Sequence, residues 1–127
     1  MDSQEYKKLA TKTEANDFNS IKERLNDDGM IRILHGAMGL NTEAGELMDA
    51  LKKHIFYNKP LDKSNLFEEL GDLFWYMALI CDELGFDFET IMEKNIAKLK
   101  VRYGHKFSSE KAEHRDIAKE RDAFEVH

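Results

Sequence analysis

Two long stretches of the chain place apolar residues at the three- and four-residue spacing of one helix face, and this pattern constrains the fold more than any other feature. The first stretch runs from Met30 to Ile55 and the second from Leu66 to Leu84. Their apolar positions are Met30, Ile33, Leu34, Ala37, Leu40, Ala44, Leu47, Met48, Leu51 and Ile55, then Leu66, Leu70, Leu73, Phe74, Met77, Cys81 and Leu84. The spacing predicts two amphipathic helices, each with a buried apolar stripe.

The segment FYNKPLD, residues 56–62, is the clearest break between these two helices. Pro60 ends or precedes a helix, and Asp62 or Ser64 is suited to cap the second helix. Gly85 follows the second stripe and is suited to end it as a C-cap residue. Because the connection is short, we expect the two helices to pack antiparallel.

The rest of the chain also predicts helices and no strands. Residues 3–25 have helical character with a break near Asn16 and Asp17, residues 26–29 form a turn or helix start, and a further helix covers about 88–102. The polar residues 108–127 are expected to be a weak docked helix or a mobile end. The sequence therefore predicts one all-α domain over residues 1–127, with its core at about 30–107. Its architecture is an antiparallel helix bundle of about four main helices with a short N-terminal helix.

Composition excludes several classes of function. The chain has 127 residues and a net charge of −6, which argues against a general nucleic-acid binder. Its single cysteine, Cys81, allows no intrachain disulfide and is expected to be a small buried apolar residue. The longest apolar run, LFWYMALIC, is far shorter than a membrane span, and the N-terminus lacks the apolar region of a secretory signal. We expect a cytoplasmic protein with no membrane or nucleic-acid partner.

Each of the two helical stretches carries a pair of acidic residues in the same register. LNTEAGELMDAL contains Glu43 and Glu46, and LFEELGDLFWYM contains Glu69 and Asp72. A helix turns about 100° per residue, so the members of each pair lie about 60° and 120° to the same side of the apolar stripe. Antiparallel packing of two such helices is expected to bring four carboxylates to one cleft.

Four converging carboxylates require a cation between them, because alone they repel one another. Oxygen ligands without histidine or cysteine select hard ions, so we expect Mg²⁺, with Mn²⁺ able to substitute. A di-iron site is disfavoured because it requires Glu-x-x-His on two helices. Gly45 and Gly71 lie at matched positions inside the acid pairs, and we expect them to give room where the helices approach or where a ligand passes.

The pattern resembles the ExxE…ExxD signature of the all-α nucleoside triphosphate pyrophosphohydrolases, which include MazG, the dCTP pyrophosphatases and the dimeric dUTPases. The segments GLNTEAGEL, FEELGDLFWYMALICDELG and KNIAKLKVRYGHKF look most like the small single-domain MazG-like proteins of phages and bacteria. The resemblance covers about residues 30–107. It implies Mg²⁺-dependent hydrolysis of a nucleoside or deoxynucleoside triphosphate to the monophosphate and pyrophosphate, in nucleotide-pool control. If the chain is phage-encoded, this would take place in the host cytoplasm.

The resemblance also implies a set of substrate-binding residues. Its N-x-x-K-L-x-x-R-Y segment places Asn95, Lys98, Arg102 and Tyr103 at the phosphates, and their spacing puts the first three on one helix face. Lys53 is a weaker phosphate candidate. Trp75 lies roughly opposite the apolar stripe and faces either a nucleobase or a partner subunit, and His35 is a further candidate for base contact.

A helix that is apolar nearly all round, as in LFWYMALIC, is expected to be buried on more than one side. We therefore expect a homodimer or a homotetramer built as a dimer of dimers, as the resemblance also implies. Two alternatives remain open. One is a non-catalytic helical bundle whose acids hold a structural metal or bind a protein, and the other is a base-selective enzyme such as a dUTPase or a dGTP-selective hydrolase.

Overall fold

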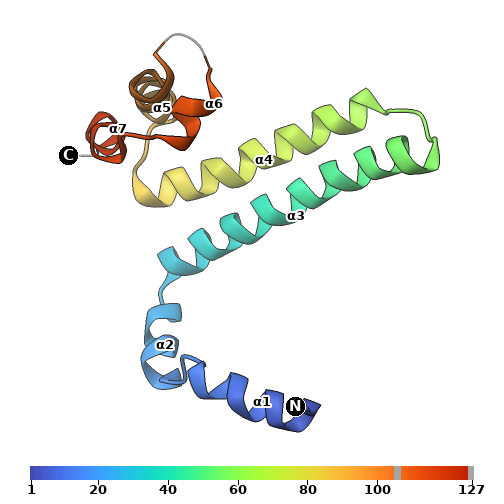
Figure 1. Cartoon of the computed structure of the whole chain (residues 1–127), viewed down its shortest axis with the longest axis vertical. Coiled ribbons are helices and arrows are strands. Elements are labelled where there is room, and N and C mark those ends of the chain that lie inside the picture. The colour runs from blue at the N-terminus through green and yellow to red at the C-terminus, as the bar shows by residue number, and fades with distance from the viewer. Residues whose placement is uncertain (105–106, 126–127) are drawn as a thin grey trace.

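The computed structural model describes residues 1–104 and 107–125, and every regular element in these ranges is helical. The elements are α1 (Ser3–Ala10), the 3₁₀ turn η1 (Thr11–Thr13), α2 (Phe18–Leu25), α3 (Asp28–Tyr57), α4 (Lys63–Leu84), α5 (Phe88–Tyr103), α6 (Ser109–Glu113) and α7 (Ile117–Phe124). Figure 1 shows α3 and α4 side by side, α5 to α7 gathered at one end, and α1 and α2 forming a separate arm. The predicted all-α class is confirmed.

The antiparallel pair of α3 and α4 is the longest feature of the molecule, and local signals set its ends. Asp27 accepts hydrogen bonds from the backbone N–H groups of Gly29 and Met30, which starts α3. Asp62 caps α4 by accepting from the N–H of Asn65 at 3.1 Å. Gly85 ends α4 in the left-handed conformation, with φ of 67°. Side-chain capping and a glycine C-cap satisfy backbone groups that a helix end leaves unpaired.

The C-terminal helices form a second pair. α7 packs along α5, and the short α6 lies between them in the chain. The polar segment predicted as a weak helix or a mobile end is therefore a docked helix over Ile117–Phe124. Its Glu120 is only 2% exposed, although it carries a charge, because it bonds to two arginines.

The apolar stripes are less covered than the sequence predicts. No apolar side chain in residues 1–104 and 107–125 is fully buried. Stripe residues such as Leu47 and Leu73 are half-buried, as is Cys81. The expectation of buried stripes is wrong for one chain, because two long helices cover only one side of each other. In the same ranges, no helix is long and apolar enough to cross a membrane.

Candidate active site

The acidic residues meet on the α3–α4 hairpin. One oxygen each from Glu43 on α3 and from Glu69 and Asp72 on α4 lie within 4.8 Å of one another. Glu43 and Glu69 are half-buried, whereas Asp72 is exposed. The structure thus brings three of the four predicted carboxylates into one group, from two helices that run in opposite directions.

This crowding changes the acidity of Glu69. Its pKa is raised to about 7, first because its carboxyl shares a hydrogen bond with Glu43. Desolvation and the negative charges of the neighbouring acids, Glu46 and Asp72 among them, act in the same direction. Half-buried oxygen ligands that repel one another fit a small hard cation, which would neutralise them and favour the ionised form of Glu69.

Glu46, the fourth predicted acid, lies beside this trio rather than within it. It is exposed and lines a cavity of about 280 Å³ together with Asp49, Lys53, Lys59 and Asn65. The ammonium group of Lys53 lies 2.6 Å from Asp49, and the charge of Glu46 also helps to raise the pKa of Lys53. Lys53, a predicted phosphate contact, is therefore close to the acids but shares its charge with Asp49.

An aromatic group lies next along the hairpin. The His35 ring is 6.3 Å from the Trp75 ring and 5.8 Å from the Tyr76 ring, with edge-to-face geometry. Trp75 and Tyr76 are themselves 5.0 Å apart. Trp75 is 57% exposed, so a large part of its indole is open to solvent. The structure brings together the two predicted base contacts, His35 and Trp75, and adds Tyr76, which follows directly in the sequence.

The close approach of α3 and α4 occurs at glycines other than those expected. A Cβ atom on Gly39 would lie 2.1 Å from the Tyr76 ring, and one on Gly36 would lie 2.5 Å from Ile80. In contrast, a Cβ on Gly45 or Gly71 would meet nothing within 4 Å. The expectation that Gly45 and Gly71 make room for helix packing is therefore wrong, because both lie on the outer side of the pair and face open space.

The predicted phosphate contacts on α5 lie away from the acids in a single chain. Gly85, which ends α4, comes 13 residues after Asp72, so α4 ends about 20 Å along its axis from the carboxylates, and α5 starts beyond that end. The extensive contacts of α5 are with α7. The fold of one chain therefore does not bring the predicted phosphate contacts on α5 to the acid trio. These contacts are Asn95, Lys98, Arg102 and Tyr103.

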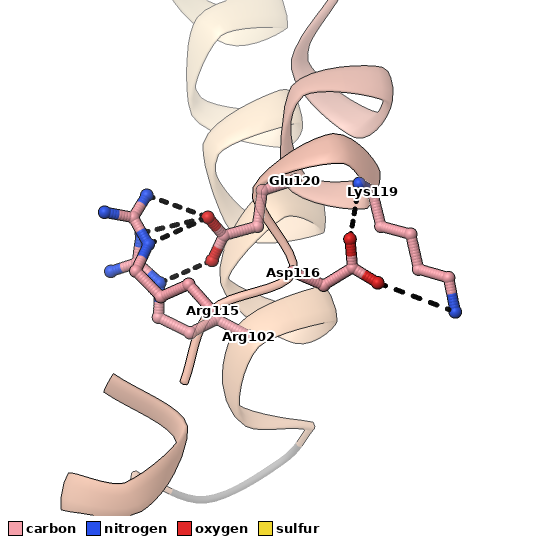
Figure 2. Close-up of polar contacts among 5 residues, drawn as sticks. All are labelled: Arg102, Arg115, Asp116, Lys119 and Glu120. Atoms are coloured by element: carbon pink, nitrogen blue, oxygen red, sulfur yellow. Dashed lines mark hydrogen bonds and ion pairs between the residues drawn. The ribbon is translucent and has the colours of Figure 1, made fainter. Parts of the chain in front are cut away.

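Arg102 has a partner that sequence reasoning missed. Its Nε donates to Glu120 Oε1 at 2.5 Å, and Arg115 donates to the other oxygen of the same carboxylate at 2.8 Å (Figure 2). Arg102 is only 16% exposed. The two arginines hold the pKa of Glu120 down to about 2. The charged stretch HRDIAKERDAF contained Arg115 and Glu120, but no local rule links Glu120 to a residue on another helix.

Comparisons with known proteins show which protein family this chain belongs to. The model of the MazG nucleotide pyrophosphohydrolase domain matches residues 36–107, which include all four acids and the α5 segment. The chain is 30% identical over 79 residues to the Gene 37 protein of Mycobacterium phage L5, covering 59% of this chain and 69% of that protein. No solved structure matches at a significant level. With more than half of its length matched by that model, the chain belongs to the MazG nucleotide pyrophosphohydrolase domain family.

Proposed function

We propose that this protein is a Mg²⁺-dependent hydrolase that converts a nucleoside or deoxynucleoside triphosphate to the monophosphate and pyrophosphate. The observation that carries the proposal is the meeting of Glu43, Glu69 and Asp72 within 4.8 Å between antiparallel helices. Family membership supports the same reaction class. The donor set is all oxygen, which suits Mg²⁺ or Mn²⁺ rather than zinc or copper.

In this proposal, Glu43, Glu69 and Asp72 hold the metal, and Glu46 completes the set. Bound Mg²⁺ would neutralise phosphate oxygens and lower the pKa of a bound water. A carboxylate that is not fully engaged accepts the proton of the attacking water. The acids thus bind and orient the polyphosphate, while Lys53 and Lys59 place positive charge at the edge of the neighbouring cavity.

The aromatic group is the proposed base site. Trp75 is exposed beside His35 and Tyr76, one turn beyond Asp72 on the same helix. Stacking of a base on an aromatic ring is worth about 1–3 kcal/mol. Trp75 is the only tryptophan in the chain, so its fluorescence reports on this site directly. We expect a nucleoside triphosphate to change that fluorescence, and inorganic triphosphate to change it much less.

We further propose that the active form is a homo-oligomer, a dimer or a dimer of dimers. Large apolar residues on the outside of α3, among them Met48, Ile55 and Phe56, are 65–75% exposed and line a cavity of about 530 Å³ with Gly45. Apolar surface of this extent favours a partner. A second copy would also supply Asn95 and Lys98 to acids that they do not reach within one chain.

Pyrophosphate release from a panel of ribo- and deoxynucleoside triphosphates with Mg²⁺ tests the activity. We expect release from at least one nucleotide, and Glu69→Gln to lower kcat about a hundredfold or more. Glu68→Gln is the matched control, because Glu68 is the adjacent acid on α4 and is exposed outside the trio. If no standard or modified nucleotide yields pyrophosphate while Mg²⁺ still binds through Glu69, the protein is a non-catalytic metal-binding bundle and the proposal fails.

Mixing two inactive variants tests the shared site. Glu69→Gln removes an acid and Lys98→Gln removes a cation, so each homo-oligomer lacks one part of every site. Mixed oligomers contain sites in which both parts are intact, and activity should return on mixing after dissociation and reassembly. The oligomers must first be shown to exchange subunits. If the mixture then recovers no activity, the acids and Lys98 act within one chain or do not act together at all.

A further inference from the structure

The connection between α3 and α4, at the closed end of the hairpin in Figure 1, is held by two hydrogen bonds at Lys59. The N–H of Lys59 donates to the Lys53 carbonyl at 3.1 Å, and the Lys59 carbonyl accepts from His54 Nδ1 at 2.8 Å. A carbonyl oxygen only accepts, so Nδ1 of His54 carries the proton. Asn58 turns the chain in the left-handed conformation, with φ of 53°, and Pro60 restricts the backbone that follows. The backbone of an exposed lysine is therefore fixed from both sides.

This connection forms one side of the cavity of about 280 Å³ beside the acid trio. Lys59 and Pro60 line the cavity from the connection itself. Glu46 and Asp49 line it from α3, and Asn65 lines it from the first turn of α4. A lysine held in a fixed loop thus shares a cavity with one of the four predicted metal acids.

Lys59 is the cation of this cavity whose charge is not already paired. Lys53 pairs with Asp49 at 2.6 Å, so these two charges largely cancel. The carboxylate of Asp62 caps α4 by accepting from the N–H of Asn65. In the described part of the chain, no carboxylate oxygen lies within 4.0 Å of Lys59 Nζ. The ammonium group of Lys59 is therefore available to an anionic ligand.

The place of the cavity along the hairpin indicates which part of a nucleotide reaches it. His35, in the proposed base site, lies about two turns before Glu43 on α3, whereas Lys53 lies about two turns after Glu46. The acids therefore lie between the base site and the cavity. In a nucleoside triphosphate the two phosphates farthest from the base are those that leave as pyrophosphate. A nucleotide with its base at the aromatic group and its phosphates at the acids thus directs its pyrophosphate end toward Lys59.

We propose that Lys59 binds the pyrophosphate part of the substrate, and that His54 is a positioning residue that holds Lys59 in place. The inference rests on the proposed function and extends that site from the metal acids to the connection between the two helices. An ammonium group binds a phosphate oxygen as a point charge. A backbone that is fixed before the ligand arrives reduces the entropy lost on binding.

Calorimetry with inorganic pyrophosphate and Mg²⁺, on the full chain, measures the Lys59 contact without turnover. We expect Lys59→Gln to weaken pyrophosphate binding about tenfold, the loss typical of one charge-assisted contact. The affinity for nucleoside monophosphates, which lack this part of the substrate, should stay unchanged. Lys52→Gln is the matched control, because Lys52 is 55% exposed, lies 3.7 Å from Asp49 and does not line the cavity. Circular dichroism verifies that each variant keeps its helix content.

Two variants of His54 test its positioning role. His54→Ala should weaken pyrophosphate binding about threefold, because Lys59 is intact but its carbonyl has lost a hydrogen bond. His54→Asn should restore most of this loss, since the asparagine side chain also offers an N–H to the Lys59 carbonyl. Wild-type affinity in His54→Ala, or an equal loss in both variants, would contradict the positioning role.

Equal pyrophosphate affinity in the wild type and Lys59→Gln would overturn the inference. So would equal losses in Lys59→Gln and Lys52→Gln, or no pyrophosphate binding by the wild type. Lys59-dependent pyrophosphate binding without turnover of any nucleotide would refute the hydrolase proposal alone. Turnover with an unchanged KM in Lys59→Gln, together with unchanged pyrophosphate affinity, would refute the role of Lys59 alone.

Discussion

Gly39 determines how closely α3 and α4 approach beside the candidate site. The Tyr76 ring occupies the space where a side chain at position 39 would begin, and the same ring contacts His35 and Trp75. The position therefore couples the packing of the hairpin to the geometry of the proposed base site. Sequence reasoning favoured Gly45 and Gly71, since their register within the acid pairs is visible, whereas the partner of Gly39 is known only from the folded pair.

Gly39→Ala should lower the free energy of unfolding by about 1–3 kcal/mol, because the added methyl group forces the Tyr76 ring out of its place. The displaced ring should also change the fluorescence of Trp75. Urea unfolding followed by circular dichroism measures the first effect. Gly71→Ala is the comparison, and should be neutral or gain up to about 1 kcal/mol as a helical glycine in open space. Equal losses in both variants would contradict this role of Gly39.

Glu69 makes the stability of the metal-free protein depend on pH. Its folded pKa of about 7 is above its ordinary value of 4.5, so folding favours its protonated form. Its contribution to stability is therefore fully present below pH 4.5 and is lost as the pH rises through about 7. We expect Mg²⁺ to raise the melting temperature more at pH 8 than at pH 5, because metal and proton compete for the same oxygens.

Thermal melts with and without Mg²⁺ across this pH range measure the effect. Glu69→Gln should remove most of the pH dependence, and Glu68→Gln should keep it. A Mg²⁺ stabilisation that is the same at pH 5 and pH 8 would argue against metal binding at Glu69.

At the scale of elements, the sequence predicted what local rules decide. Asp62 and Gly85 are caps because a side-chain oxygen and a left-handed glycine satisfy nearby backbone groups, and each lies at a position that the sequence suggested. The short connection after Tyr57 made the antiparallel hairpin predictable. The docking of α7 was not, because it depends on a pairing of Arg102 with Glu120 between helices that are joined by a polar segment. A weak apolar pattern alone left a docked helix and a mobile end equally open.

Glu120→Gln should loosen α7 from α5. The change removes the charge that Arg102 and Arg115 share, and we expect amide hydrogen exchange in α7 to accelerate by about tenfold or more while α3 and α4 are unaffected. Asp122→Asn, on the exposed surface of the same helix, should leave exchange unchanged. If both variants exchange like the wild type, the buried ion pair does not hold the helix.

The pH range of this docking follows from the lowered pKa of Glu120. Its value of about 2 is below the ordinary 4.5, so its contribution is present above pH 4.5 and is lost as the pH falls through about 2. Protection of α7 should therefore persist at pH 5.

At the scale of the whole molecule, the sequence predicted the helices and a meeting of four acids, of which the structure brings three together. It did not predict how little one chain covers its own apolar surface. Phe67 and Phe56 are 80% and 75% exposed, although both lie on long helices. The three- and four-residue spacing of apolar residues identifies the apolar face of a helix. It does not specify whether the same chain or another chain covers that face. For the same reason the sequence placed the acids and the α5 cations in one site without showing that a single chain keeps them apart.

Met48→Lys should dissociate the proposed oligomer. Met48 is 66% exposed on the outer face of α3, and burying a lysine there would cost several kcal/mol unless it were paired. Light scattering coupled to size-exclusion chromatography should give a mass of two or four times 14.8 kDa for the wild type and a smaller mass for the variant. Lys7→Gln, on the separate α1 arm, is the control. A wild-type mass of a single chain would refute the assembly.

The absence of a fully covered apolar side chain within the described ranges also bears on how this protein responds to dilution. If two chains bury their apolar faces only against each other, folding and association are one equilibrium governed by mass action. Each tenfold dilution then removes about 1.4 kcal/mol from the driving force. The melting temperature would fall as the sample is diluted, and the cellular concentration of the chain would set the fraction of molecules that is folded, assembled and active.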